Sequence, residues 1–118
     1  RYEGTLDSFG KPDGKGTLYY KNGAKEYHGW FQKGKPYGHG LYYDEHGRIR
    51  YKGEFRDQRF SGIGMYFYPD GSRYGGEWKD HKRHGKGMCY NAKGEIKYVG
   101  ELQNDLYHGI GTVFEENQ

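Results

Sequence analysis

The residues of this chain best suited to chemistry are aromatic rings that recur at nearly constant spacing. The sequence holds 14 Tyr, 6 Phe and 2 Trp among 118 residues. One column repeats a tyrosine followed four residues later by a second ring, and it contains Tyr27, Phe31, Tyr51, Phe55, Tyr74, Trp78 and Tyr98. Rings in such a column favour apolar binding, so we expect a groove that holds a helical or extended segment of a partner protein. The alternative is that these rings form only the core of the fold.

A second aromatic column follows the first in every repeat. It contains Tyr19, Tyr43, Phe67, Tyr90 and Phe114. The alternation of side chains along a strand does not decide which of the two columns faces the groove, so both stay candidates.

A cluster of basic residues occupies one expected turn. Lys79, Lys82 and Arg83 lie close to His81 and His84. Basic residues near a membrane surface attract anionic lipid headgroups by about 1 kcal/mol each, so phospholipid contact is one interpretation. A solvated turn is the other, because runs of surface charge commonly have no further role.

The sequence has no pattern that indicates catalysis, a cofactor or a metal. No nucleophile is flanked by a base and an orienting group at recognisable spacing. His81, His84, His108 and Cys89 do not supply the three or four convergent ligands that zinc requires. The carboxylates of one repeat column are expected on an exposed face: Glu54, Glu77 and Glu101. We therefore expect a protein that is not an enzyme.

Composition restricts the partners and the compartment. The net charge is +3, and basic and acidic residues interleave, so no basic stripe predicts nucleic-acid binding. The sequence shows neither a long apolar run nor a signal peptide. The single cysteine, Cys89, fits a reducing compartment, so we expect an intracellular protein.

Glycine columns run in register with the rings and define the repeat. The ring tyrosines recur every 23 to 25 residues, and each is followed by one glycine and then by a Gly-x-Gly pair. We place the repeats at about 2–26, 27–50, 51–73, 74–97 and 98–118. A fixed period of this length predicts a repeat array, in which neighbouring units bury each other's apolar faces. The chain begins with Arg1, and we expect it to be a fragment of a longer array.

Each repeat predicts a β-hairpin. Tyr51, Gly53 and Phe55 alternate with polar residues, a polar turn spans 56–60, and a second strand runs over about 62–68. Asn22-Gly23 and Asp70-Gly71 predict tight hairpin turns in which both residues have positive φ. His46-Gly47 and Lys93-Gly94 occupy the same place. No segment shows a helical period, so about ten antiparallel strands are expected.

The glycines predict close contact with rings. Glycine inside a strand commonly marks a site that another group approaches, and a ring from the neighbouring strand can cover the bare positions. Tyr74 or Trp78 lying over Gly85 and Gly87 is the expected example.

These residues resemble the MORN repeat (membrane occupation and recognition nexus), whose pattern is Y-x-G-x-W-x-x-G-x-x-x-G-x-G. The segment 74–78, YGGEW, followed by 84–87, HGKG, is the nearest copy, and 51–55 with 62–64 is similar. The resemblance covers the whole chain. Leu6 and Leu102 replace the aromatic residue in the end repeats, and the first repeat has one extra residue between its glycine columns.

The resemblance implies a fold and a set of roles. The fold is an all-β, single-layer antiparallel meander of five hairpin repeats, elongated and twisted, with an aromatic-lined groove. The role is a scaffold for protein–protein interaction in a ciliary, flagellar or cortical cytoskeletal assembly. The alternatives are a tether to anionic phospholipid and a regulatory array of a larger enzyme. A homodimer through a sheet edge or end is a further expectation.

Overall fold

The chain folds entirely into strands and turns. The structure is a computed structural model that describes residues 1–114, and no helix occurs among them. Residues 115–118 of the fifth expected repeat lie outside the described residues. The described part of the chain has no helix with the length and apolar character needed to cross a membrane.

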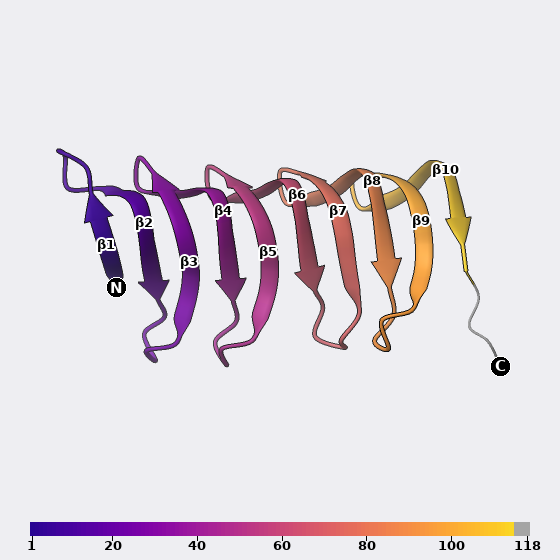
Figure 1. Ribbon diagram of the computed structural model, residues 1–118, viewed down its shortest axis with the longest axis horizontal. Coiled ribbons are helices and arrows are strands. Elements are labelled where there is room, and N and C mark those ends of the chain that lie inside the picture. The colour runs from indigo at the N-terminus through magenta and orange to yellow at the C-terminus, as the bar shows by residue number, and fades with distance from the viewer. Residues whose placement is uncertain (115–118) are drawn as a thin grey trace. The chain divides into compact units, whose positions relative to one another are not determined.

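The chain divides into two compact units, Arg1–Arg59 and Phe60–Gln118. The strands of the first unit are β1 (Tyr2–Leu6), β2 (Pro12–Tyr19), β3 (Lys25–Gln32), β4 (Lys35–Tyr43) and β5 (Ile49–Arg56). Those of the second are β6 (Arg59–Phe67), β7 (Arg73–Lys79), β8 (Lys82–Tyr90), β9 (Ile96–Gln103) and β10 (Leu106–Val113). Within each unit, strands that follow one another in sequence pair antiparallel (Figure 1). The expected all-β meander of hairpins is therefore confirmed.

The glycine columns align into rows that cross the strands. In the first unit, Gly29 pairs with Gly16 on one side and with Gly40 on the other. In the second unit, Gly87 pairs with Gly76 and Gly100. Backbones approach so closely here that a Cβ on Gly76 would lie 2.5 Å from the Cα of Gly87.

A ring covers the second glycine of each described Gly-x-Gly pair for which the contact is resolved. The ring of Tyr27 occupies the place of a side chain at Gly40, and the ring of Tyr74 does the same at Gly87. The expected cover of Gly87 by Tyr74 is confirmed. The expected ring over Gly85 is wrong, because the side chain of Glu77 fills the space beside that glycine.

One hydrogen bond fixes each of these tyrosines. The hydroxyl donates to the carbonyl oxygen of the residue three positions later, at distances of 2.6 to 3.0 Å. The five pairs are Tyr2 with Thr5, Tyr27 with Trp30, Tyr51 with Glu54, Tyr74 with Glu77 and Tyr98 with Glu101. A buried hydroxyl without a partner would destabilise the fold, so this bond makes burial of the whole phenol ring tolerable.

The tight two-residue turns lie at the opposite end of the strands from the place that the sequence predicts. Lys33-Gly34 joins β3 to β4 with φ values of 52° and 84°, and Asp80-His81 joins β7 to β8 with values of 50° and 70°. Both positions of such a turn need positive φ, which matches the twist of the flanking strands. The expected polar turn at 56–60 is shorter than predicted, since β6 already begins at Arg59.

The predicted Asn-Gly and Asp-Gly turns have another geometry. In the turn after β2, the amide of Gly23 donates to Tyr20 O (3.0 Å), and that of Tyr20 donates to Ala24 O (2.8 Å). Only the glycine has positive φ, whereas Asn22 does not. The expectation of two positive φ values at Asn22-Gly23 and Asp70-Gly71 is therefore wrong. A type I turn followed by one left-handed glycine joins these strands instead.

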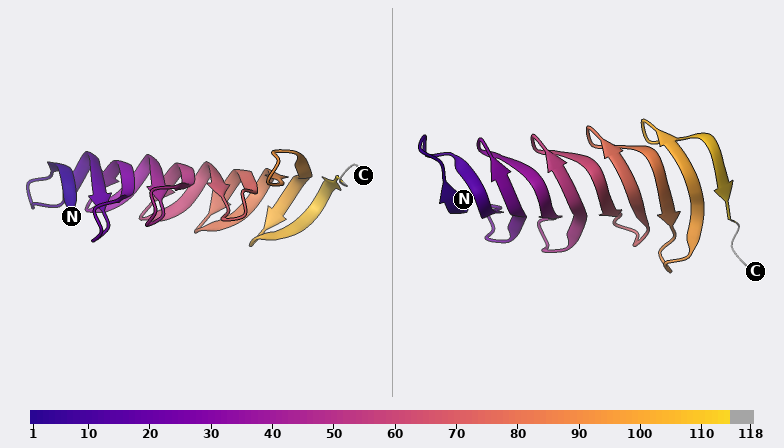
Figure 2. Two further views of the ribbon diagram at one scale, coloured as in Figure 1. Left: turned by 90° about the horizontal axis from the view of Figure 1, so that it is seen from below. Right: turned by 45° about the horizontal axis from the view of Figure 1, so that its top comes forward.

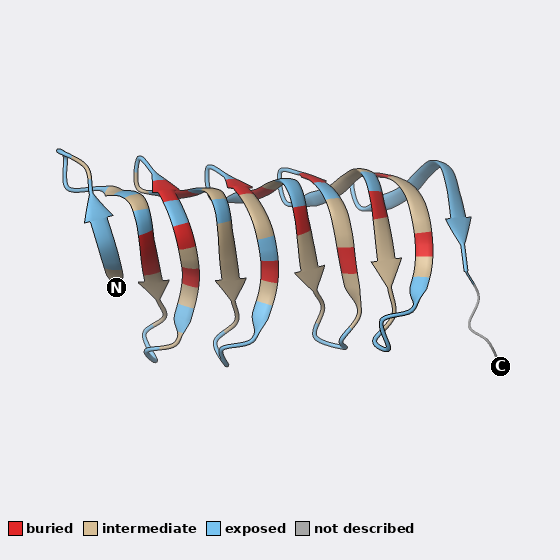
Figure 3. Cartoon of the chain, in the orientation of Figure 1, coloured by how far each residue is buried: buried red, intermediate tan, exposed pale blue. Residues whose placement is uncertain are grey.

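The longer strands curve along their length in both units (Figure 2). Buried positions recur at matching places on successive strands (Figure 3). The most buried side chains are Tyr27, Phe31, Tyr51, Phe55, Phe60, Tyr74, Trp78, Tyr98 and Leu102, each no more than 9% exposed. The core is thus built largely from rings, which compensate for the scarcity of aliphatic residues.

Candidate functional site

In the first unit, the candidate rings form a continuous edge-to-face series. The centroids of Tyr27 and Phe31 lie 5.1 Å apart, with the ring planes at 85°. Tyr27 also contacts Phe55 at 4.9 Å, and Tyr51 contacts Phe55 at 5.0 Å. Such pairs contribute roughly 0.5–1.5 kcal/mol each beyond the area that they bury. The face that carries these rings, and its counterpart in the second unit, is called the ring face below.

The second unit continues the pattern with different partners. Tyr74 packs edge-to-face on Trp78 at 5.2 Å, and Phe60 packs on the same indole at 5.4 Å. The indole nitrogen of Trp78 donates to the carbonyl oxygen of Gly64 at 3.0 Å. Tyr98 stacks flat on Tyr107, with centroids 3.9 Å apart.

All seven predicted groove residues lie in the core of the ring face. Tyr27, Phe31, Tyr51, Phe55, Tyr74, Trp78 and Tyr98 have exposed fractions of only 0–6%. Their rings therefore stabilise the sheet, and their direct contact with a partner stays a prediction. Leu102 replaces the ring of the last repeat and is equally buried, whereas Leu6 is 58% exposed.

Partly exposed tyrosines lie beside the buried column on the same face. Tyr42 is the cross-strand partner of both Tyr27 and Tyr51, and Tyr66 is the partner of Tyr74. Cross-strand partners project from the same side of a sheet, so Tyr42 and Tyr66 belong to the ring face. Both remain accessible to a ligand.

Burial raises the pKa of the ring tyrosines. The pKa of Tyr74 rises from 10.0 to about 12, chiefly because burial disfavours the phenolate. The pKa values of Tyr27 and Tyr51 rise for the same first reason. These hydroxyls therefore act as neutral hydrogen-bond donors and do not serve as acids near pH 7.

We expect alkaline pH to unfold the chain through these tyrosines. Their folded pKa values are raised, so the stability that they contribute is fully present below their unfolded pKa of 10.0 and is lost as pH rises towards 12. Urea titrations followed by circular dichroism should give a constant midpoint up to about pH 9 and a falling midpoint above about pH 10. An unchanged midpoint at about pH 11 would contradict this assignment.

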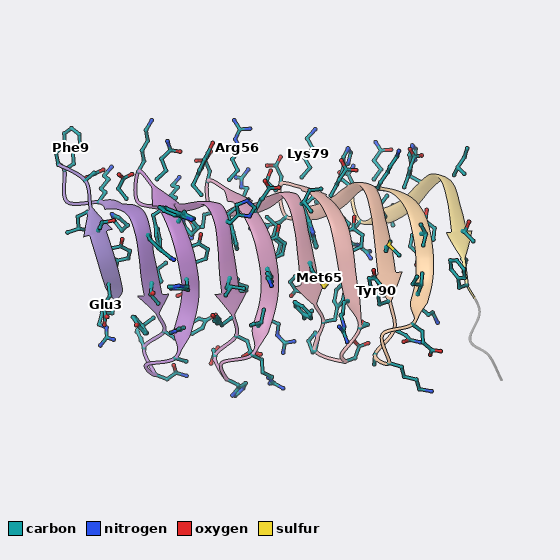
Figure 4. All side chains as sticks on the ribbon, viewed as in Figure 1. Glu3, Phe9, Arg56, Met65, Lys79 and Tyr90 are labelled. Atoms are coloured by element: carbon teal, nitrogen blue, oxygen red, sulfur yellow. The ribbon has the colours of Figure 1, made fainter. Side chains whose placement is uncertain are left out.

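Three members of the second aromatic column lie where the strand register shifts: Tyr19, Tyr43 and Tyr90. Tyr43 pairs with Ile49 after a shift at Tyr42, so simple alternation does not place it on the ring face. The guanidinium of Arg1 lies 4.4 Å from the centroid of Tyr19, and that of Arg73 lies 5.9 Å from Phe67. Tyr19 and Phe67 of this column thus each contact an arginine. Tyr90 lies at the end of β8 (Figure 4). It also lines a hollow described below.

The structure separates the three basic residues of the predicted lipid site. Lys79 and Lys82 are exposed on either side of the β7–β8 turn, and Lys79 extends away from the strands (Figure 4). Arg83 instead lies partly buried, with its Nε 3.3 Å from Oδ1 of Asp105. Arg83 is therefore committed to an ion pair, whereas the two lysines face solvent.

Metal and nucleophile chemistry find no support in the residues described. Among residues 1–114, no group of three His, Cys, Asp or Glu side chains is placed to hold a metal ion. Burial raises the pKa of the Cys89 thiol, so the weakly nucleophilic protonated form prevails at neutral pH. In the carboxylate column, Glu77 accepts a hydrogen bond from the backbone amide of Lys86 at 2.5 Å. That contact gives this carboxylate a structural role.

The ring face has a hollow that the sequence pattern does not predict. A hollow of about 720 Å³ opens in the second unit, and its lining includes Tyr68, Arg83, Cys89 and Tyr107. A sequence signal for the hollow exists at the position one residue before the second aromatic column. This position is Tyr42 in β4 and Tyr66 in β6, but it is Cys89 in β8.

The comparisons with known proteins identify the family. The family model of the MORN repeat matches residues 2–25, 51–73, 74–96 and 98–113. This is a family of non-enzymatic repeats that are generally involved in protein–protein or membrane/phospholipid interactions. A search of curated proteins found no match to the chain. The four matched segments cover more than half of the sequence, and each begins at a ring tyrosine whose hydroxyl donates a hydrogen bond: Tyr2, Tyr51, Tyr74 and Tyr98. The chain belongs to the MORN repeat family.

Proposed function

We propose that this chain is a non-enzymatic scaffold that holds a segment of a partner protein against its ring face. The observation that carries this proposal is the pairing of buried and partly exposed rings on one face of each unit. The buried column fixes the backbone, while Tyr42 in the first unit and Tyr66 in the second leave aromatic surface accessible. The general role of the family in protein–protein interaction supports the same conclusion.

Tyrosine side chains suit such a surface for a physical reason. A tyrosine buries a large apolar area on binding, and its hydroxyl still finds a hydrogen-bond partner. Tyr42 is held between two fully buried rings, Tyr27 and Tyr51, so little side-chain entropy is left to lose when a partner binds. A helical or extended segment lying across the strands of either unit would meet the partly exposed tyrosine of that unit beside its buried rings.

The setting of this scaffold is also a proposal. We place it inside the cell, in a cytoskeletal assembly of a cilium, a flagellum or the cell cortex. This placement rests on the resemblance to the family and on the reducing environment that a single free thiol, Cys89, favours.

Selection of displayed random peptides against the folded chain tests the function. We expect selected peptides to lose at least about tenfold in affinity when Tyr66 is changed to Ser, because a central aromatic contact is removed. The matched control is Trp30→Ser, since Trp30 is 50% exposed and alternates with the ring residues of β3. Equal losses in both variants, or no selected peptide, would overturn the ring-face proposal.

Phospholipid binding is the alternative function. Two exposed lysines, Lys79 and Lys82, provide only about 2 kcal/mol of attraction to an anionic membrane, and salt weakens it. Sedimentation with anionic vesicles at low and high salt separates the two functions. Strong vesicle binding that is lost in the Lys79→Gln/Lys82→Gln variant would favour the membrane tether.

Two further proposals concern larger assemblies. The chain would regulate an enzyme if it belongs to a longer protein that has a catalytic domain, and the full-length gene tests this. A homodimer through a sheet edge is a proposal for a protein in which no further repeat covers β10, where Leu106, Ile110 and Val113 are 64–89% exposed. A sedimentation velocity profile that stays monomeric at high concentration would dismiss the dimer.

A further inference from the structure

The hollow in the second unit arises from a change of side chain within the repeat. The residue opposite the next ring tyrosine is Tyr42 on β4 and Tyr66 on β6, but it is Cys89 on β8. A thiol is far smaller than a phenol ring, so the exchange leaves space on the ring face. The hollow at this place has a volume of about 720 Å³, which is in the range of small-molecule pockets.

A second change of side chain places a cation beside this space. At the second residue of the corresponding strands, the chain has Pro36 in β4, Phe60 in β6 and Arg83 in β8. The guanidinium of Arg83 lies 5.6 Å from the ring centroid of Tyr74, and its Nη2 donates to the carbonyl oxygen of Asp105 at 2.7 Å. Contacts on two sides therefore hold the guanidinium in a defined orientation.

Arg83 has hydrogen-bonding capacity left over. A guanidinium has five N–H donors. The described contacts use Nε and one N–H of Nη2 for Asp105, and one N–H of Nη1 for the Sγ of Cys89 at 3.8 Å. Among the residues described, one N–H on each terminal nitrogen has no assigned acceptor. A carboxylate accepts such a pair of N–H groups with two parallel hydrogen bonds.

The charges around the hollow indicate an occupant with a single negative charge. Arg73, Arg83 and Lys97 contribute three positive charges. Asp70 lines the same hollow, and Asp105 pairs with Arg83, so one positive charge is in excess. A carboxylate matches this excess, whereas a phosphate monoester carries about −1.5 to −2 near neutral pH.

We propose that this hollow binds the carboxylate of a glutamate or aspartate side chain in the partner segment, with Arg83 as the pairing residue. Tyr68 and Tyr107 line the walls, and a charge-assisted hydrogen bond between a guanidinium and a carboxylate is stronger than one between neutral groups. The statement that the carboxylate belongs to a partner peptide rests on the proposed function. The complementarity of the hollow to a carboxylate does not depend on that function.

A fragment titration followed by NMR tests the hollow directly. The probe is N-acetyl-glutamate N-methylamide, and the reporters are the side-chain Nε–H of Arg83 and the amide of Cys89. We expect saturable shifts at millimolar probe. The glutamine analogue and inorganic phosphate should bind at least tenfold more weakly. Equal shifts with the glutamine analogue, or tighter binding of phosphate, would overturn the proposal.

Two variants with different risks locate the effect. Arg83→Met removes the guanidinium but keeps an unbranched stem. Cys89→Tyr places beside Arg83 the larger side chain that β4 and β6 carry at this position, which obstructs the hollow. Both substitutions should abolish the probe-induced shift at the backbone amide of residue 89. Lys79→Met, on the same hairpin, should leave that shift unchanged. If Arg83→Met fails to fold, a folded Cys89→Tyr chain that still binds the probe would contradict the proposal.

The peptide selection separates this inference from the proposed function. Selected peptides that bind the ring face yet share no acidic residue, and bind Arg83→Met normally, would overturn the hollow and leave the scaffold function standing. Binding of the glutamate probe without any selected peptide would support the hollow and count against the scaffold function.

Discussion

Replacement of Gly29 by alanine is expected to lower the free energy of unfolding by more than about 3 kcal/mol. Gly29 has a φ of +157°, which side chains rarely adopt, and a Cβ there would lie 2.6 Å from the Cα of Gly40. The carbonyl oxygen of His39 lies equally close. These are backbone atoms of the paired strand, so relief would require the two strands to separate.

Gly23→Ala is the matched control for this substitution. Gly23 belongs to the same unit and also has a positive φ, of +91°, but no atom lies within 4 Å of its added Cβ. We expect a cost of only about 1 kcal/mol there, from backbone conformation alone. Urea titration of both variants measures the difference. Similar losses of stability in the two variants would show that the close approach of the paired strands is not the reason for glycine at these positions.

Replacement of Tyr27 by alanine is expected to cost about 3–5 kcal/mol, the range for removing a large buried ring. Tyr27 is 2% exposed, contacts Phe31 and Phe55, and covers Gly40. Its removal would open a cavity between two strands and expose the glycine backbone. The loss should appear in the denaturant midpoint and the thermal midpoint alike.

Tyr27→Phe separates the ring from its hydroxyl. The hydroxyl donates to the carbonyl oxygen of Trp30 at 2.7 Å, and loss of such a bond costs about 1 kcal/mol. The phenylalanine variant should therefore retain most of the stability that the alanine variant loses. If both variants lost the same amount, the hydrogen bond would be the main contribution of this residue, contrary to the packing described here.

The repeat pattern predicts the fold well because its determinants are local. Glycine and ring columns in register imply paired strands, and the cover of Gly87 by Tyr74 follows from the same pattern. Turn geometry is less predictable. Asn22-Gly23 matches two turn types, and the choice depends on how many residues the hydrogen bonds enclose. Asp80-His81 forms the tight turn without any glycine, so composition alone does not indicate it.

The ring-face surface was harder to predict than the strands that carry it. Tyr42 and Tyr43 are adjacent aromatics, and the register shift between them removes the simple alternation that would assign each one to a face. A one-residue error in register exchanges the faces of a strand. The role of Arg83 depends on Asp105, which lies in the next hairpin turn, and no local pattern relates the two.

Buried rings hold the sheet together, and we propose that the partly exposed tyrosines beside them bind the partner. The most direct measurement is the affinity of one selected peptide for two double variants. Each double variant carries one substitution in the first unit and one in the second. Tyr42→Ala/Tyr66→Ala should weaken binding at least about tenfold while the chain stays folded. Phe55→Leu/Trp78→Phe should lose stability yet keep its affinity per folded molecule. A larger loss of affinity in the second variant than in the first would contradict the account.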